Sequence, residues 1–137
     1  MIIMKNKKLT IGISLRVVGN TDYNEKRDAL SQDWSKFFEK LEINPLLIPN
    51  TIKNVSEFLE DMQVQGLFLS GGDNIGDNQD RDVTEQKIID YCLEKKIPLI
   101  GICRGMQVIN TFFGGKIETL ENSKHVGDPH FVSLNEN

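Results

Sequence analysis

The chain has 137 residues, of which 39% are hydrophobic and 26% charged, and its formal net charge is −4. This size suits one globular domain over residues 1–137, and the acidic balance without a Lys/Arg-rich stripe argues against nucleic acid or an anionic membrane as a partner. No apolar run approaches the ~20 residues that cross a bilayer, and no secretory signal opens the chain. We therefore expect a cytoplasmic protein.

Strand-like and helix-like stretches alternate along the chain, separated by short connections. Apolar runs rich in β-branched residues predict strands, and apolar residues at helical spacing predict helices. In chain order the pattern predicts a strand at 8–15, a polar loop at 16–26, a helix at 27–42, a strand at 44–50, a helix at 57–63, a strand at 66–74, a helix at 81–97, a strand at 97–102, a helix at 104–113 and a strand from 130. This alternation predicts an α/β fold, a parallel sheet with helices on both faces.

Local signals suggest where two of the helices begin. Ser56 is the expected N-cap of the helix at 57–63, and Asp82 followed by Glu85 forms a capping-box-like start for the next helix. Cys92 falls on the apolar stripe of that helix, so we expect a buried core thiol. Two cysteines make no disulfide framework and lack zinc-site spacing, and the sequence implies no metal and no organic cofactor.

A sharp corner between a strand and a helix carries the second cysteine, in the pattern Gly101-x-Cys103-x-Gly105. Flanking glycines relieve the crowding of a strained turn, which is the logic of a nucleophile elbow. The turn holds the sulfur at the carboxyl end of the sheet and at the positive end of the next helix, which favours a thiolate. We therefore predict that Cys103 is a catalytic nucleophile rather than a small core residue.

A cysteine that attacks a carbonyl needs hydrogen-bond donors for the oxyanion that forms. The backbone N–H of Arg104, directly after the cysteine, is one candidate. The stretch "LSGGDN" at 69–74 supplies the second, because Gly71 and Gly72 allow the backbone to approach a ligand. We predict an oxyanion hole from the N–H groups of Gly72 and Arg104, with Gly71 at the substrate; the alternative is a plain strand-ending turn.

Together the motifs "GICRGMQVIN", "LFLSGGDN" and "RDVTE" resemble those of the class I glutamine amidotransferase-like family, in its gamma-glutamyl hydrolase branch. The resemblance implies a flavodoxin-like core and a Cys–His–Glu triad that cuts γ-glutamyl amides. It implies that Cys103 is the nucleophile, that Gly72 and Arg104 form the oxyanion hole, and that Gln107 holds the glutamyl end of the substrate.

The implied reaction converts γ-glutamyl-X and water to glutamate and X through a thioester on Cys103. The substrate is a small molecule, and X is a small amine or a CDP-amidate, a phosphoramidate of the kind used in capsule biosynthesis. A phosphate-bearing X needs positive charge, for which Arg81 and Arg104 are candidates. The loop at 73–80 is short and carries three aspartates, so we expect its recognition of X to differ from that of many relatives.

The triad's His-x-Glu pair does not occur in this sequence. Only His125 and His130 are present, and both read best as loop or strand-edge residues; a surrogate pair of His125 with Asp128 is poorly motivated. We therefore expect the catalytic histidine and glutamate beyond Asn137, with this chain forming the N-terminal two-thirds of the domain.

Three other functions compete with a free-standing hydrolase, and the oligomeric state stays open. A glutaminase subunit would feed ammonia to a partner synthetase, although such subunits often have leucine where this chain has Arg104. A non-catalytic binding relative would tolerate loss of Cys103. A stress-protein-like cousin usually has histidine directly after the cysteine, and Arg104 argues against that reading.

Overall fold

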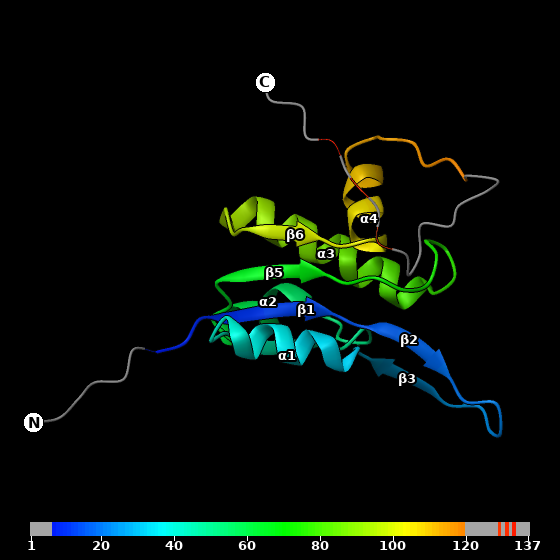
Figure 1. The fold of residues 1–137 in the computed structure, drawn as a ribbon, viewed down its shortest axis with the longest axis horizontal. Coiled ribbons are helices and arrows are strands. Elements are labelled where there is room, and N and C mark those ends of the chain that lie inside the picture. Colours follow the sequence, from blue (N-terminus) through cyan, green and yellow to red (C-terminus); the bar gives the residue numbers. More distant parts are fainter. Residues whose placement is uncertain (1–6, 120–128, 130, 132, 134–137) are drawn as a thin grey trace, which may run out of the picture.

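The computed structural model describes residues 7–119 together with 129, 131 and 133. A parallel sheet in the order β4-β1-β5-β6 forms its centre, and a separate antiparallel hairpin pairs β2 with β3 (Figure 1). The strands are β1 Thr10–Ser14, β2 Arg16–Gly19, β3 Lys26–Ala29, β4 Asn44–Ile48, β5 Gly66–Leu69 and β6 Leu99–Gly101. The helices are α1 Gln32–Lys40, α2 Val55–Asp61, α3 Gln79–Lys95 and α4 Arg104–Phe112.

Helices pack on both faces of the parallel sheet, as the sequence predicts. On one face, Phe38 of α1 is buried against Ile11 and Ile13 of β1, with Trp34 and Phe68 packed around them. On the other face, apolar residues of α2 and α3 form the larger core with β4 and β5, and α4 packs against its edge. Burial of these apolar surfaces is what holds the strands in register.

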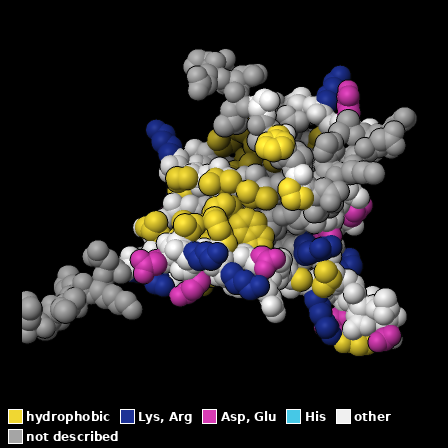
Figure 2. Space-filling view, in the orientation of Figure 1, with side chains coloured by type: hydrophobic (Ala, Val, Ile, Leu, Met, Phe, Trp, Pro, Cys, Tyr) yellow, Lys and Arg dark blue, Asp and Glu magenta, His cyan; other side chains and the backbone are white. Residues whose placement is uncertain are grey.

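The face that carries α1 is only partly covered in the described part of the chain. Apolar side chains gather over α1 and the neighbouring strands (Figure 2). They include Ile100 and Ile102, which are exposed at the end of the sheet, and Phe37 on α1. Trp34, Phe37, Phe68 and Ile102 line a shallow depression of about 330 Å³ on this face.

The predictions for residues 16–26 and for the start of the helix at 27–42 are wrong. The supposed polar loop contains β2, and the chain returns as β3 before α1 begins at Gln32. Val17 and Val18 suit a strand, but a tertiary contact fixes the hairpin: Asp28 accepts hydrogen bonds from the backbone N–H (2.9 Å) and Nδ2 (2.8 Å) of Asn50, at the end of β4. Helical spacing alone offered no hint of that contact.

The two predicted helix starts are also wrong, because in each case an asparagine further upstream caps the helix. Asn54, not Ser56, caps α2, and its side chain accepts a hydrogen bond from Glu57 N–H (3.2 Å). Asn78 caps α3 and accepts from Arg81 N–H (3.1 Å), which leaves Asp82 inside the helix. Asparagine is a preferred N-cap residue, and the observed caps lie two residues before Ser56 and four residues before Asp82.

Cys92 is a core thiol, 4% exposed, and burial raises its pKa to about 11. None of the helices in the described ranges is long and apolar enough to span a membrane. The expected strand from 130 falls mainly on positions that are not described, and so do His125, Asp128 and His130.

Candidate active site at the carboxyl edge of the sheet

Cys103 occupies the turn between β6 and α4, as the elbow pattern predicts. It is the N-cap residue of α4, with φ 54° and ψ −111°, and it is exposed. A non-glycine residue at such a positive φ is strained and persists only where the surrounding fold imposes it. Here β6 and α4 approach so closely that a Cβ added at Gly101 would lie 2.5 Å from the carbonyl carbon of Gly105.

The end of β5 forms the neighbouring wall of the site. Ile102 N–H donates to Leu69 C=O (3.0 Å), which aligns the ends of β5 and β6. A Cβ added at Gly71 would lie 3.3 Å from Cys103 Cβ and 3.8 Å from its Sγ, so Gly71 leaves room for the cysteine. Gly72 follows with φ 84°, a conformation that favours glycine. The structure therefore brings Gly71, Gly72 and Cys103 together.

The two predicted oxyanion-hole amides are available as donors. Neither Gly72 N–H nor Arg104 N–H donates to an acceptor among the described residues. Arg104 is the first residue of α4, where helix geometry leaves the amide without an intrahelical partner. Gln107 lies one turn further along α4 and is half-buried. The oxyanion role of these amides and the substrate role of Gln107 stay predictions.

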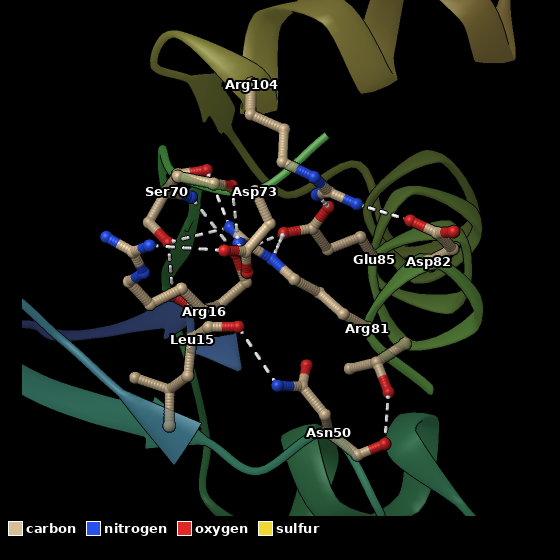
Figure 3. Close-up of polar contacts among 12 residues, drawn as sticks. Leu15, Arg16, Asn50, Ser70, Asp73, Arg81, Asp82, Glu85 and Arg104 are labelled. Atoms are coloured by element: carbon tan, nitrogen blue, oxygen red, sulfur yellow. Dashed lines mark hydrogen bonds and ion pairs between the residues drawn. The ribbon is translucent and has the colours of Figure 1, made fainter. Parts of the chain in front are cut away.

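The loop that carries the two glycines is held by one buried side chain, Arg81 (Figure 3). Its guanidinium donates to three successive carbonyl oxygens: Ser70 (3.0 Å), Gly71 (3.0 Å) and Gly72 (2.7 Å). It also pairs with Asp73 Oδ2 (2.9 Å). Because all three carbonyls point toward Arg81, the arginine fixes the course of the loop beside Cys103.

Glu85, also on α3, connects this loop to the elbow. The fully buried carboxylate accepts from Arg81 Nε (3.1 Å) and from Ser14 Oγ (2.7 Å), and it pairs with Arg104 Nη1. Arg104 pairs with Asp82 through its other terminal nitrogen. The elbow, the glycine loop and the end of β1 thus meet on one carboxylate (Figure 3).

The expectation that Arg81 and Arg104 supply positive charge to a phosphate is wrong. Their side chains are 0% and 2% exposed, and the carboxylates of Asp73, Asp82 and Glu85 neutralise the two guanidinium groups. A buried, paired arginine has no face open to a ligand. Burial was not evident from the sequence because the two arginines stand where a helix begins, a place that is usually solvated.

Two of the three aspartates in the loop at 73–80 make contacts that hold the structure. Asp73 accepts from Val17 N–H (3.1 Å) and pairs with Arg81 and with Arg16 Nη2 (3.2 Å). Partial burial raises the pKa of Asp73, but the Val17 amide and the two arginines outweigh it and hold the pKa below its usual value. Asp77 accepts from Asn74 N–H (2.8 Å) within the loop.

Sequence reasoning missed the polar stripe of α3, although a signal for it was present. Arg81 and Glu85 precede Ile88 and Cys92 at spacings of 4, 3 and 4, so all four share one helix face. The apolar members are buried, and the charged pair continues the same buried stripe. Nothing in the sequence singles out Arg16, because the segment 16–26 has the composition of a polar loop.

A model of the peptidase C26 family matches residues 10–133. The chain belongs to this family. Membership confirms the resemblance that the cysteine, glycine and "RDVTE" motifs suggested, and it agrees with the observed α/β sheet.

This peptidase C26 chain is similar in sequence to several proteins, which match different shares of it. It is 37% identical over 124 residues to the gamma-glutamyl-CDP-amidate hydrolase of Campylobacter jejuni, and this match covers 85% of this chain and 60% of that protein. It is 32% identical over 92 residues to a glutamine-hydrolyzing GMP synthase subunit from Methanococcus aeolicus (67% of this chain, 45% of that protein). It is 34% identical over 79 residues to a GMP synthase of Listeria monocytogenes (58% and 14%). The chain therefore spans less than two-thirds of each of these relatives.

Replacing Gly101 with alanine tests the close approach of β6 and α4. Since the new Cβ would overlap backbone atoms of Gly105 and Met106, we expect the free energy of unfolding to fall by about 2 kcal/mol or more. Gly19→Ala is the control, because its Cβ would meet nothing within 4 Å, and it should change stability by about 0.5 kcal/mol or less. Urea denaturation measures both, and equal effects would contradict the packing described.

Replacing Arg81 with methionine tests its structural role. The change leaves Glu85 and three loop carbonyls buried with fewer partners, so we expect a loss of about 3–5 kcal/mol in the free energy of unfolding. Arg27→Met is the control, because Arg27 pairs with Glu25 on the exposed hairpin. The midpoint of its urea denaturation should stay close to that of the wild type. A small loss at Arg81 would show that it does not hold the loop.

The lowered pKa of Asp73 predicts a pH dependence. Because the pKa is lower in the folded chain than the unfolded value of about 3.9, ionised Asp73 stabilises the fold at neutral pH, and this contribution disappears as the pH falls through the folded pKa. The destabilisation caused by Asp73→Asn should therefore be largest near neutral pH and shrink below about pH 4. Paired urea titrations across this range check it; a constant difference would refute it.

Proposed function

We propose that this chain supplies the nucleophile and oxyanion hole of a cysteine hydrolase that cleaves γ-glutamyl amides. One observation carries the proposal: Cys103 stands exposed at a positive φ with its Sγ against Gly71, and the amides of the residues that follow these two in the chain, Gly72 and Arg104, have no acceptor among the described residues. A strained, exposed cysteine beside unpaired amides suits attack on a carbonyl.

In the proposed reaction the Cys103 thiolate adds to the γ-carbonyl carbon of the substrate, and the carbonyl oxygen becomes an oxyanion. The N–H groups of Gly72 and Arg104 bind this oxyanion; a single such donor is typically worth about 3–4 kcal/mol of transition-state stabilisation. The C–N bond then breaks, the amine leaves with a proton, and a thioester remains on Cys103. Water hydrolyses the thioester to release glutamate.

The reaction also needs a general acid–base for the leaving amine and for the attacking water. Histidine is the usual group, and the described residues contain none. We propose that a histidine outside the described residues serves this role, oriented by a carboxylate. Cys103 and the two amides thus form the nucleophilic half of the site.

We further propose a phosphoramidate nucleotide as the leaving group, in preference to a small amine. The support is the 37% identity with a protein named gamma-glutamyl-CDP-amidate hydrolase, over 85% of this chain. Similarity to GMP synthases favours glutaminase activity as the second candidate. In that case the substrate would be glutamine and the leaving group ammonia.

Glutamate release by the full-length protein tests this function. The substrates are glutamine, γ-glutamyl-γ-aminobutyrate and a γ-glutamyl phosphoramidate nucleotide. We expect the nucleotide to be the best substrate, and Cys103→Ala and Cys103→Ser to lower kcat by about 10⁴-fold or more. Cys92→Ala, the same change at the buried thiol, should keep kcat.

The other outcomes identify the rivals. Glutamate release from glutamine alone would point to an ammonia-supplying subunit. No glutamate release from any of the three substrates would favour a non-catalytic binding protein. Iodoacetamide labelling gives a readout independent of turnover: Cys103 is exposed, whereas burial protects Cys92 and raises its pKa to about 11. Labelling of Cys92 before Cys103 would contradict the site described.

A further inference from the structure

A third arginine, Arg16, lies directly on the glycine loop. A Cβ added at Gly72 would lie 3.1 Å from Arg16 Nε, 3.2 Å from its Cζ and 3.3 Å from its Cδ. The two glycines therefore face different side chains, because Gly71 faces Cys103 and Gly72 faces Arg16. The guanidinium of Arg16 thus borders the predicted oxyanion hole.

Arg16 differs from the other two arginines of this cluster in its exposure. Its side chain is 49% exposed, whereas those of Arg81 and Arg104 are 0% and 2% exposed. Its one hydrogen bond among the described residues runs from Nη2 to Asp73 Oδ1 (3.2 Å). A guanidinium has five N–H donors in a fixed fork, so most of the donors of Arg16 have no partner in the described part of the chain and can bind a ligand.

Asp73 accepts a hydrogen bond from Arg16 (Figure 3), and the Arg16 side chain stays 49% exposed. The second carboxylate oxygen of Asp73 accepts from Val17 N–H (3.1 Å) and from Arg81 Nη1 (2.9 Å). A backbone amide and a buried arginine therefore hold Asp73 in place, independently of its pairing with Arg16. A surface arginine held in this way loses less conformational entropy when it binds an anion.

The strand order places Arg16 on the side of the loop opposite the elbow. Cys103 follows β6, Gly71 and Gly72 follow β5, and Arg16 follows β1, which is the next strand along the sheet. A γ-glutamyl substrate has two arms that diverge from the attacked carbonyl. If Gln107 on α4 holds the glutamyl arm beyond the elbow, the arm with the leaving group extends across Gly72 toward Arg16.

We propose that Arg16 is a specificity-determining residue that binds the phosphate groups of the leaving group. The inference rests on the proposed γ-glutamyl hydrolase function and assigns its substrate class, an amide whose leaving group carries a phosphate or diphosphate. The guanidinium fork matches two phosphate oxygens. It also offsets the acidic loop at 73–80, whose aspartates would otherwise repel such an anion.

Turnover by the full-length protein separates this role from a structural one. Two substrates share the glutamyl arm: a γ-glutamyl phosphoramidate nucleotide and γ-glutamyl p-nitroanilide, whose leaving group is uncharged. Arg16→Gln should lower kcat/KM for the nucleotide by about 30-fold, and at least tenfold more than for the anilide. Arg16→Lys should recover part of the lost kcat/KM. Arg27→Gln, the same charge change on the exposed hairpin, should leave kcat/KM unchanged for both substrates.

Binding provides the second readout. Inorganic pyrophosphate should inhibit anilide hydrolysis competitively, and Arg16→Gln should raise its inhibition constant about tenfold. An equal fall of kcat/KM on both substrates would assign Arg16 to the glutamyl arm or to loop structure. An unchanged substrate ratio and inhibition constant would exclude the subsite. Both results overturn the proposal.

The proposed function can fail separately from this inference. If the wild type cleaves no γ-glutamyl amide, calorimetric titration with pyrophosphate still compares it with the Arg16→Gln protein. Pyrophosphate binding that depends on Arg16 would then support the anion site while rejecting the hydrolase. Binding that is absent, or equal in both proteins, would reject the anion site.

Discussion

Arg81 reaches from α3 under the end of β5 and donates hydrogen bonds to the carbonyl oxygens of Ser70, Gly71 and Gly72. A loop of small residues at the edge of a sheet has many accessible conformations, and the two glycines increase their number. Three bonds from one rigid guanidinium select a single conformation. The position of the loop beside Cys103 therefore depends on a residue of α3.

Burying that guanidinium is costly unless its charge is neutralised, and the fold meets the requirement with carboxylates. Glu85 lies one helical turn from Arg81 and also pairs with Arg104, the residue after Cys103. The same network thus fixes the glycine loop and the first turn of α4. A catalytic geometry that must be held within fractions of an ångström benefits from such shared support.

The three arginines near the site divide their tasks according to exposure. Arg81 and Arg104 are enclosed and neutralised, so they stabilise structure, whereas the side chain of Arg16 is 49% exposed. Their residue type alone does not distinguish them. Pairing with acidic residues of α3 encloses Arg81 and Arg104, whereas Arg16 stays half exposed at the start of β2.

The sequence by itself determined the α/β class, most of the strands, the elbow at Cys103 and the core position of Cys92. These features follow from local rules: alternation of apolar runs, glycine spacing at a tight turn, and helical periodicity. The β2–β3 hairpin, the buried Arg81–Glu85–Arg104 network and the exposure of Arg16 were decided by the tertiary structure. Each depends on contacts between residues far apart in the chain, such as Asp28 with Asn50, Ser14 with Glu85 and Arg16 with Asp73. No local pattern encodes those pairings, because they exist only once the strands, the hairpin and α3 have packed together.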